Sequence, residues 1–121
     1  MSKSNLIIEL SLSFAINSIS IYKKLVKEKE FVISKQFLKA STSIGANVSE
    51  SIYAQSKPDF IHKLSIALKE ARETEYWLIL LKRTELTNID LTNHLNDIRE
   101  ILRVLTSIIV TTKKNIKHNR K

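Results

Sequence analysis

The chain has 121 residues, of which 43% are hydrophobic and 26% charged, and its formal net charge is +8. These values are typical of one folded domain, here residues 1–121, and argue against a disordered chain. The absence of cysteine excludes disulfides, thiolate metal sites and thiol nucleophiles, and agrees with the cytoplasmic location that we expect. With one glycine and one proline in the whole sequence, the chain is expected to form long helices.

The first helix is expected over residues 4–28, followed by a connection through residues 31–33. Two apolar stripes, roughly 120° apart, run along this helix. The first stripe comprises Ile8, Leu12, Ala15, Ile19, Tyr22 and Val26, and the second comprises Ile7, Leu10, Phe14 and Ile21. One stripe is enough for a monomeric bundle, so the surplus stripe predicts contact with another chain. Asn17 lies on the second stripe, where a buried polar residue would set the helix register.

The second helix is expected over residues 34–54, with Ser34 as its N-cap. Small residues recur at every fourth position along it, at Ser41, Gly45 and Ser49. Such a ridge lets a neighbouring helix approach closely, although a kink at Gly45 is an alternative. Asn47 and Glu50 are predicted to hydrogen-bond to a neighbouring helix or a loop, the alternative being a ligand or subunit contact.

The third helix is expected over residues 57–84 and the fourth over residues 88–115. Ser56 is the predicted cap of the third, with Pro58 in its first turn and Asp59 near the positive end of its dipole. The apolar arc of the fourth is roughly 160° wide, again more than a monomer needs. Since the connections are short, we expect an all-α, antiparallel, up-down-up-down four-helix bundle that forms a homo-oligomer.

No catalytic or metal-binding constellation emerges from the sequence. The three histidines lack the repeated Glu-x-x-His spacing of di-metal bundles, and a single glycine excludes a phosphate-binding loop. Glu70, Glu73 and Glu75 are interleaved with bases, which indicates ion pairing on a helix surface. Of Tyr76 and Trp77, one should point to the core and one to the surface, at a subunit rim or as a base-stacking platform. We expect no enzyme, no metal and no cofactor.

Basic residues are concentrated at the end of the chain. Residues 113–121 contain five bases and no acid, whereas the other 112 residues contain 15 bases and 12 acids. The tail predicts a polyanion partner, the alternative being a solvated helix end whose cations suit the helix dipole. The candidate nucleic-acid-binding residues are Lys82, Arg83, Arg99, Arg103, Lys113, Lys114, Lys117, Arg120 and Lys121.

Two segments together resemble a known family. The segment from Gln36 to Glu50 resembles the signature of the 23S ribosomal RNA intervening-sequence proteins: a glutamine, a basic-small pair, then Ser-Ile-x-Ala-Asn-Ile-x-Glu. The segment from Phe60 to Leu78 resembles the third helix of that family. The following residues match these motifs or occupy positions within them: Gln36, Ser43, Gly45, Asn47, Glu50, Glu73 and Glu75. Phe31-Val32 departs from the family's Phe-Pro, and Glu50-Ser51 departs from its Glu-Gly.

The resemblance implies an antiparallel four-helix bundle that assembles as a ring-like homopentamer. It also implies similarity to the accessory proteins of diversity-generating retroelements, which bind nucleic acid and a reverse transcriptase. Our first hypothesis is therefore a non-enzymatic oligomeric module that binds RNA phosphates. The second is a protein-interaction scaffold that uses its apolar faces, for example for a reverse transcriptase. Since no uninterrupted apolar run is long enough to span a membrane, no membrane partner is expected.

Overall fold

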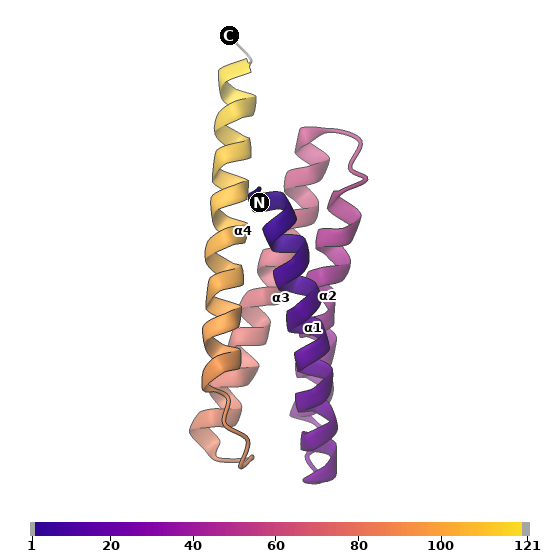
Figure 1. The fold of residues 1–121 in the computed structure, drawn as a ribbon, viewed down its shortest axis with the longest axis vertical. Coiled ribbons are helices and arrows are strands. Elements are labelled where there is room, and N and C mark those ends of the chain that lie inside the picture. The colour runs from indigo at the N-terminus through magenta and orange to yellow at the C-terminus, as the bar shows by residue number, and fades with distance from the viewer. Residues whose placement is uncertain (1, 120–121) are drawn as a thin grey trace.

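The structure, a computed structural model, describes residues 2–119 as four helices joined by short connections (Figure 1). They are α1 (Lys3–Lys27), α2 (Ile33–Ser51), α3 (Lys57–Thr84) and α4 (Thr92–Asn119). No strand occurs among the described residues. The prediction of an all-α chain of four helices is therefore confirmed.

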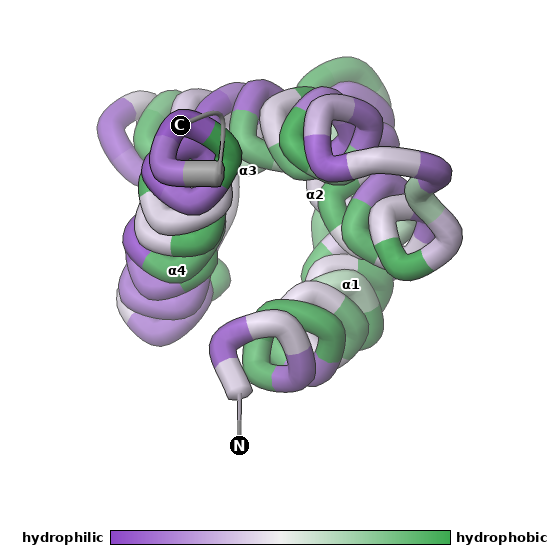
Figure 2. The backbone as a smooth tube through the Cα atoms, turned by 90° about the horizontal axis from the view of Figure 1, so that it is seen from above, coloured by the Kyte–Doolittle hydropathy of each residue, from purple (hydrophilic) through white to green (hydrophobic). Residues whose placement is uncertain are grey.

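The helices pack in chain order around one core. Each helix contacts its two neighbours, most extensively between α2 and α3 and least between α1 and α4. Viewed from above, they surround a common centre (Figure 2). The largest fully buried side chains include Phe14, Phe37, Leu64, Leu78, Ile98 and Leu105. All four helices thus contribute to a single hydrophobic cluster.

α1 buries only one of its two apolar stripes. Its buried residues are Ile7, Ser11, Phe14, Ser18 and Leu25, so the core uses the second stripe. On the first stripe, Leu12 remains 55% exposed and Ile19 41% exposed.

The expectation that Asn17 is buried is wrong, because Asn17 is exposed. It precedes Ser18 by one residue, which turns its side chain about 100° away from the buried line. The polar residue that α1 buries is therefore Ser18, not Asn17.

α4 has no comparable surplus. Its apolar residues fill the core with Leu95, Ile98, Ile101, Leu105, Ile108 and Ile109. Of the large hydrophobic residues of α4 within the described part of the chain, only Val110 is strongly exposed. The prediction of a free apolar face on this helix is wrong, since α4 packs against both α3 and α1 and buries most of the wide arc.

α2 begins at Ile33 without the predicted cap. Ser34 is buried, and its hydroxyl donates to the Glu30 carbonyl at 2.7 Å. The Glu30 carboxylate takes the capping role, accepting from the amides of Ile33 at 2.9 Å and Ser34 at 2.6 Å. Burial alone would raise the pKa of Glu30, but these amide hydrogen bonds outweigh it and the pKa lies below the usual value.

α2 also ends earlier than predicted, at Ser51 instead of Ala54. The amides of Ile52, Tyr53 and Ala54 donate to carbonyls three residues back, at 3.3, 3.1 and 3.2 Å. Bonds of this spacing tighten the chain into a turn and satisfy the last carbonyls of the helix. The helix therefore stops without a glycine.

The predicted start of α3 is confirmed, whereas that of α4 is not. The hydroxyl of Ser56 accepts from the amide of Asp59 at 3.1 Å. α4 begins at Thr92, four residues later than predicted, and the Thr92 amide donates to Asp90 Oδ1 at 3.0 Å. Thr87 and Asn88 instead hydrogen-bond to the Glu28 carboxylate at the end of α1, which holds them in the loop.

The ridge of small residues on α2 provides a close approach to α1. A Cβ atom on Gly45 would lie 3.4 Å from the backbone oxygen of Ser11 and 3.7 Å from its Oγ. These are van der Waals distances, so the backbones of α1 and α2 approach as closely as a small residue allows. The interpretation of Gly45 as a packing residue is favoured.

α1 is also long and apolar enough, by length and composition alone, to cross a membrane. An 18-residue window within it has a mean hydropathy of 1.3, and 28% of that window is buried. Core helices of soluble proteins share this composition, so the expectation of no membrane span stays a prediction.

We predict that Gly45→Ala raises the free energy of unfolding by up to about 1 kcal/mol, because alanine favours the helix and its methyl group fits at van der Waals distance. Urea denaturation measures this change. The matched control is Ala46→Gly, one residue further at an exposed position, which should lower stability by a similar amount. A clear loss of stability in Gly45→Ala would contradict the packing described here.

Candidate nucleic-acid interface

The structure brings most of the predicted nucleic-acid-binding residues onto one side of the molecule. We call them the basic flank: Lys82, Arg83, Arg99, Arg103, Lys113, Lys114 and Lys117. The first three line a hollow of about 220 Å³ between α3 and α4, together with Ile79 and Leu95. Arg103 and Lys114 line a second hollow of about 600 Å³ along α4.

On α4 the bases of the basic flank share one face. At 100° per residue, the positions from Arg99 to Lys117 that carry them fall within an arc of roughly 100°. The acids Asp97 and Glu100 of the same helix project outside this arc. With a rise of 1.5 Å per residue, the row from Arg99 to Lys117 is roughly 27 Å long. The bases form two groups on this face, Arg99 with Arg103 and Lys113 with Lys114 and Lys117, separated by uncharged residues 104–112.

One base of the basic flank is held by a carboxylate. Arg99 Nε donates to Glu75 Oε2 of α3 at 3.1 Å. Since Arg99 is about half exposed, this pair adds little stability, but it holds the Arg99 side chain against α3. The other bases of the flank make no ion pair within the described part of the chain. Their charge is therefore available to a partner.

α4 extends as a helix well into the basic tail. The helix continues to Asn119, beyond the predicted end at residue 115. Lys3, at the start of α1, donates to Ser107 of α4, so the last turns of α4 run on past α1 (Figure 1). Lys113, Lys114 and Lys117 are exposed on this extension. Arg120 and Lys121 lie outside the described residues.

The motif residues of the second helix have local structural roles. Asn47 Nδ2 donates to the Ser43 carbonyl of its own helix at 2.9 Å. The predicted hydrogen bond of Asn47 to a neighbouring helix or loop is thus wrong, because the carbonyl one turn earlier is the nearer acceptor. Glu50 pairs with Lys63 of α3 at 3.1 Å, on an exposed surface. Gln36 is exposed.

The carboxylates of α3 lie on its surface. Glu73 is exposed, and burial, followed by the negative charge of Glu73, raises the pKa of Glu70. The positive charges of Lys69 and Lys39 oppose that shift. No group of His, Asp or Glu side chains in the described residues could hold a metal ion.

Tyr76 and Trp77 divide between surface and interior as predicted. Tyr76 is 56% exposed, and its ring meets the Trp77 ring edge to face at a centroid distance of 5.1 Å. Trp77 is partly buried, and its Nε1 is buried without a hydrogen-bond partner. Of this pair, Tyr76 is therefore the ring that is accessible to a partner.

Sequence reasoning missed a buried polar pair that joins α1 to α4. Ser18 Oγ and His94 Nε2 are hydrogen-bonded at 2.8 Å. The imidazole stacks on Phe14 at 4.0 Å and meets the edge of Phe37 at 5.8 Å. Burial lowers the pKa of His94 to about 4, so the ring is neutral at neutral pH. In the sequence, Ser11 and Ser18 lie three and four residues from Phe14 and therefore share its helix face. This spacing could have indicated a polar position in the core.

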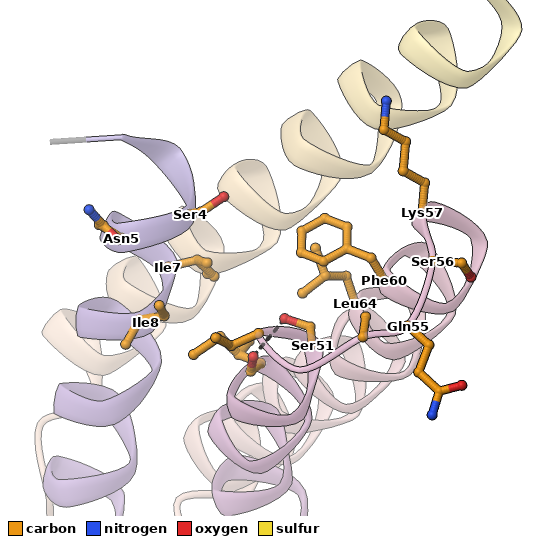
Figure 3. Close-up of a pocket in the computed structure, with 13 residues that line it drawn as sticks. Ser4, Asn5, Ile7, Ile8, Ser51, Gln55, Ser56, Lys57, Phe60 and Leu64 are labelled. Carbon is orange, nitrogen blue, oxygen red and sulfur yellow. Dashed lines mark hydrogen bonds between the residues drawn. The ribbon is translucent and has the colours of Figure 1, made fainter. Parts of the chain in front are cut away.

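An apolar hollow of about 440 Å³ opens at the end of the bundle where α1 begins and α3 starts (Figure 3). Ile7, Phe60 and Leu64 form its walls. Of its polar residues, Ser51 already donates to the Val48 carbonyl at 2.6 Å, while Gln55 points away in Figure 3. Binding sites for small molecules combine apolar walls with convergent polar groups. Neither Ser51 nor Gln55 offers such a polar group to this hollow.

Comparison with known proteins gives the family. The family of the 23S rRNA-intervening sequence protein matches residues 3–107, which cover all of α1, α2 and α3 and more than half of α4. The chain belongs to this family. The resemblance found in the two sequence motifs is thereby confirmed, and its motif residues lie on α2 and α3.

A solved structure supports the assignment. The chain is 54% identical to a protein of unknown function of the S23 ribosomal protein family from Bacteroides thetaiotaomicron, whose crystal structure was determined at 1.70 Å. The match covers 89% of this chain and 98% of that protein, with a TM-score of 0.85. No curated protein shows significant similarity to the chain.

We predict that the stability of the protein falls as the pH drops from 6.5 to about 4. In this window His94 becomes protonated in the unfolded chain but stays neutral in the folded chain. The stability that neutral His94 contributes is therefore complete above pH 6.5 and is lost toward pH 4. The loss from this residue is roughly 3 kcal/mol. Urea denaturation at several pH values measures it.

Comparing the pH profiles of variants separates the contribution of His94 to the pH dependence of stability from the contributions of the carboxylates. The profile of His94→Gln should be flatter than that of the parent chain in this window. His62→Gln, at an exposed histidine, is the matched control variant. Identical slopes for His94→Gln and the parent chain would show that His94 is protonated equally in both states.

Proposed function

We propose that this protein is a non-enzymatic, oligomeric module that binds RNA through phosphate contacts in the cytoplasm, without a cofactor. The observation that carries the proposal is the basic flank, which joins the end of α3 to a row of bases on α4. Lysine and arginine contacts to phosphates position a nucleic acid without reading its sequence. The family description, which refers to 23S rRNA, adds support for RNA as the polyanion.

The proposed assembly is a ring-like homopentamer of antiparallel four-helix bundles. Two contacts support the antiparallel order: Lys3 at the start of α1 lies beside Ser107 in the second half of α4, and Glu50 late in α2 lies beside Lys63 early in α3. The exposed apolar row on α1, formed by Leu12, Ile16 and Ile19, supports self-association. A ring would also repeat the basic flank, so that several subunits contact one RNA.

We predict that RNA binding is salt-dependent and requires the basic flank. Fluorescence anisotropy at about 50 mM and about 200 mM salt should show a strong loss of affinity with salt, since each neutralised phosphate releases counterions. A chain ending at Thr112 lacks the tail lysines and should bind more weakly, with a shallower salt dependence. Unchanged affinity after this truncation and after raising the salt would exclude the proposal.

Double variants distinguish the effect of the basic flank from the effect of net charge. Arg99→Gln combined with Arg103→Gln should weaken binding to all RNA sequences alike, because both contact phosphates. Lys69→Gln with Lys39→Gln removes the same charge from exposed positions outside the flank and should have little effect. Equal losses in the two double variants would indicate a general charge effect without a defined site.

A second function is a protein-interaction scaffold, for example for a reverse transcriptase. The observation that favours it is an apolar groove of about 270 Å³ between α1 and α2. Its lining includes Leu12, Gly45 and Ile52, and the exposed residues Ile16 and Ile19 extend it along α1. A groove of this kind fits the apolar face of a partner helix.

We predict that Leu12→Ser with Ile16→Ser disrupts self-association without unfolding the bundle, because both side chains are exposed in the isolated chain. Light scattering gives the mass, and circular dichroism checks the fold. The control is Val110→Ser, an exposed apolar position on α4. If the double variant keeps its oligomeric state, the α1 face is free for a different protein, which a stoichiometric pull-down from nuclease-treated lysate would recover.

A further inference from the structure

The two loops at the end of the bundle opposite the start of α1 are joined into one surface. The Glu28 carboxylate, at the end of α1, accepts from the Thr87 hydroxyl and from the Asn88 amide at 3.1 Å. It thereby ties the α1–α2 loop to the α3–α4 loop, at the lower end of the view in Figure 1. We call this surface the tip; it comprises residues 28–32 and 85–91.

The tip exposes large apolar side chains. Val32 is 74% exposed, Phe31 52% and Leu86 49%. None of these residues lines a pocket described above, and their neighbours Ile33 and Ile89 are partly buried against the core. Phe31, Val32 and Leu86 therefore project from a surface that is itself anchored to the bundle.

A collar of bases flanks the α1–α2 half of the tip. Five lysines lie within residues 23–35, against two acids, so this segment carries a net charge of +3. All five are exposed: Lys23, Lys24, Lys27, Lys29 and Lys35. Lys23 and Lys27 lie on the side of α1 opposite the buried Leu25, and Lys29 lies in the loop beyond the helix.

Of the acids near the tip, Glu28, Glu30 and Asp90 are engaged within the fold, whereas Glu85, at the end of α3, is exposed. Glu28 holds the two loops together, and Glu30 accepts hydrogen bonds from the first amides of α2. Asp90 accepts from the Thr92 amide, and hydrogen bonds from Thr92 lower the pKa of this carboxyl. The collar lysines make no ion pair within the described residues. The hydrogen-bonded carboxylates keep their negative charge, but the five lysines, together with Glu85, are the charged groups that remain free to contact a partner.

We propose that the tip docks on an anionic lipid surface, with Phe31, Val32 and Leu86 entering the interface between headgroups and acyl chains and the lysine collar contacting the headgroups. Stable attachment to a membrane surface needs two signals, and an apolar anchor with a polybasic patch supplies both. Phosphate contacts to RNA would explain the lysines but not the exposed Val32 and Leu86, which offer no hydrogen bond and no ring to stack.

This contact differs from the function proposed above. It uses the lysines of α1 and α2 and leaves the tail of α4 free. It also revises the expectation of no membrane partner, which rested on the absence of a long apolar run. Surface docking needs only a few exposed apolar residues beside bases.

The absence of cysteine permits a direct test with single labels. An environment-sensitive fluorophore is attached to the single cysteine of the Val32→Cys variant, at the tip. In a second variant, Tyr53→Cys, it is attached at the other end of the bundle, where Tyr53 is 82% exposed. The full chain is mixed with vesicles of phosphatidylcholine containing about one-third phosphatidylglycerol, or with pure phosphatidylcholine. The label at position 32 should shift to the blue with anionic vesicles only, and the label at position 53 should not shift.

Co-sedimentation of unlabelled variants with the vesicles measures their affinity for the lipid surface. Phe31→Ser with Val32→Ser should lower partitioning onto anionic vesicles by about tenfold or more, and each collar lysine changed to glutamine by about fivefold. Ile52→Ser with Tyr53→Ser is the matched control at the opposite end and should partition like the parent chain.

Four results would overturn the proposal. A label at position 53 that responds as strongly as the label at position 32, or no response at either, would exclude docking through the tip. A response at position 32 to RNA but not to vesicles would assign the collar to nucleic acid. A response that depends only on protein concentration would show that a second copy of the chain covers the tip.

Discussion

A helix in a four-helix bundle touches two neighbours and can bury only part of its circumference. α1 carries two apolar stripes, so packing one of them necessarily exposes the other. The chain buries the line of Ile7, Phe14 and Leu25, whose intervening positions Ser11 and Ser18 are small. Ser11 lets Gly45 of α2 approach closely, and Ser18 reaches α4. The exposure of Leu12 and Ile19 on the other stripe is the direct result of that packing.

The contact between α1 and α4 is the smallest in the bundle, and a polar pair lies within it. Ser18 and His94 hydrogen-bond to each other, and the His94 ring stacks on the ring of Phe14. A buried polar pair adds little net stability, but leaving either partner alone costs the desolvation of that group. The pair thus penalises other rotations of α1 against α4, and it makes this seam the place where proton binding weakens the fold.

Acids and bases have different roles in this chain. Glu28, Glu30, Asp59 and Asp90 accept hydrogen bonds from backbone amides at helix ends and loops. Most bases make no such contact and remain on the surface. A chain with 20 bases and 12 acids therefore exposes more positive than negative groups that are free to contact a partner. Bases are concentrated on α4 and at the lower end of the bundle.

The helices, the cap of α3 and the family were all predictable from the sequence, because 3.6-residue periodicity, capping residues and motifs are local in the chain. The burial of α1 was not, since two stripes of similar hydrophobicity do not indicate which one a neighbour covers. The pairing of Ser18 with His94 joins residues 76 positions apart, and the capping by Glu30 depends on how the loop turns. The sequence by itself determined which segments are helical and where charge accumulates. Only the tertiary structure decided which faces are buried and which bases lie together, because both depend on the rotation of each helix against its neighbours.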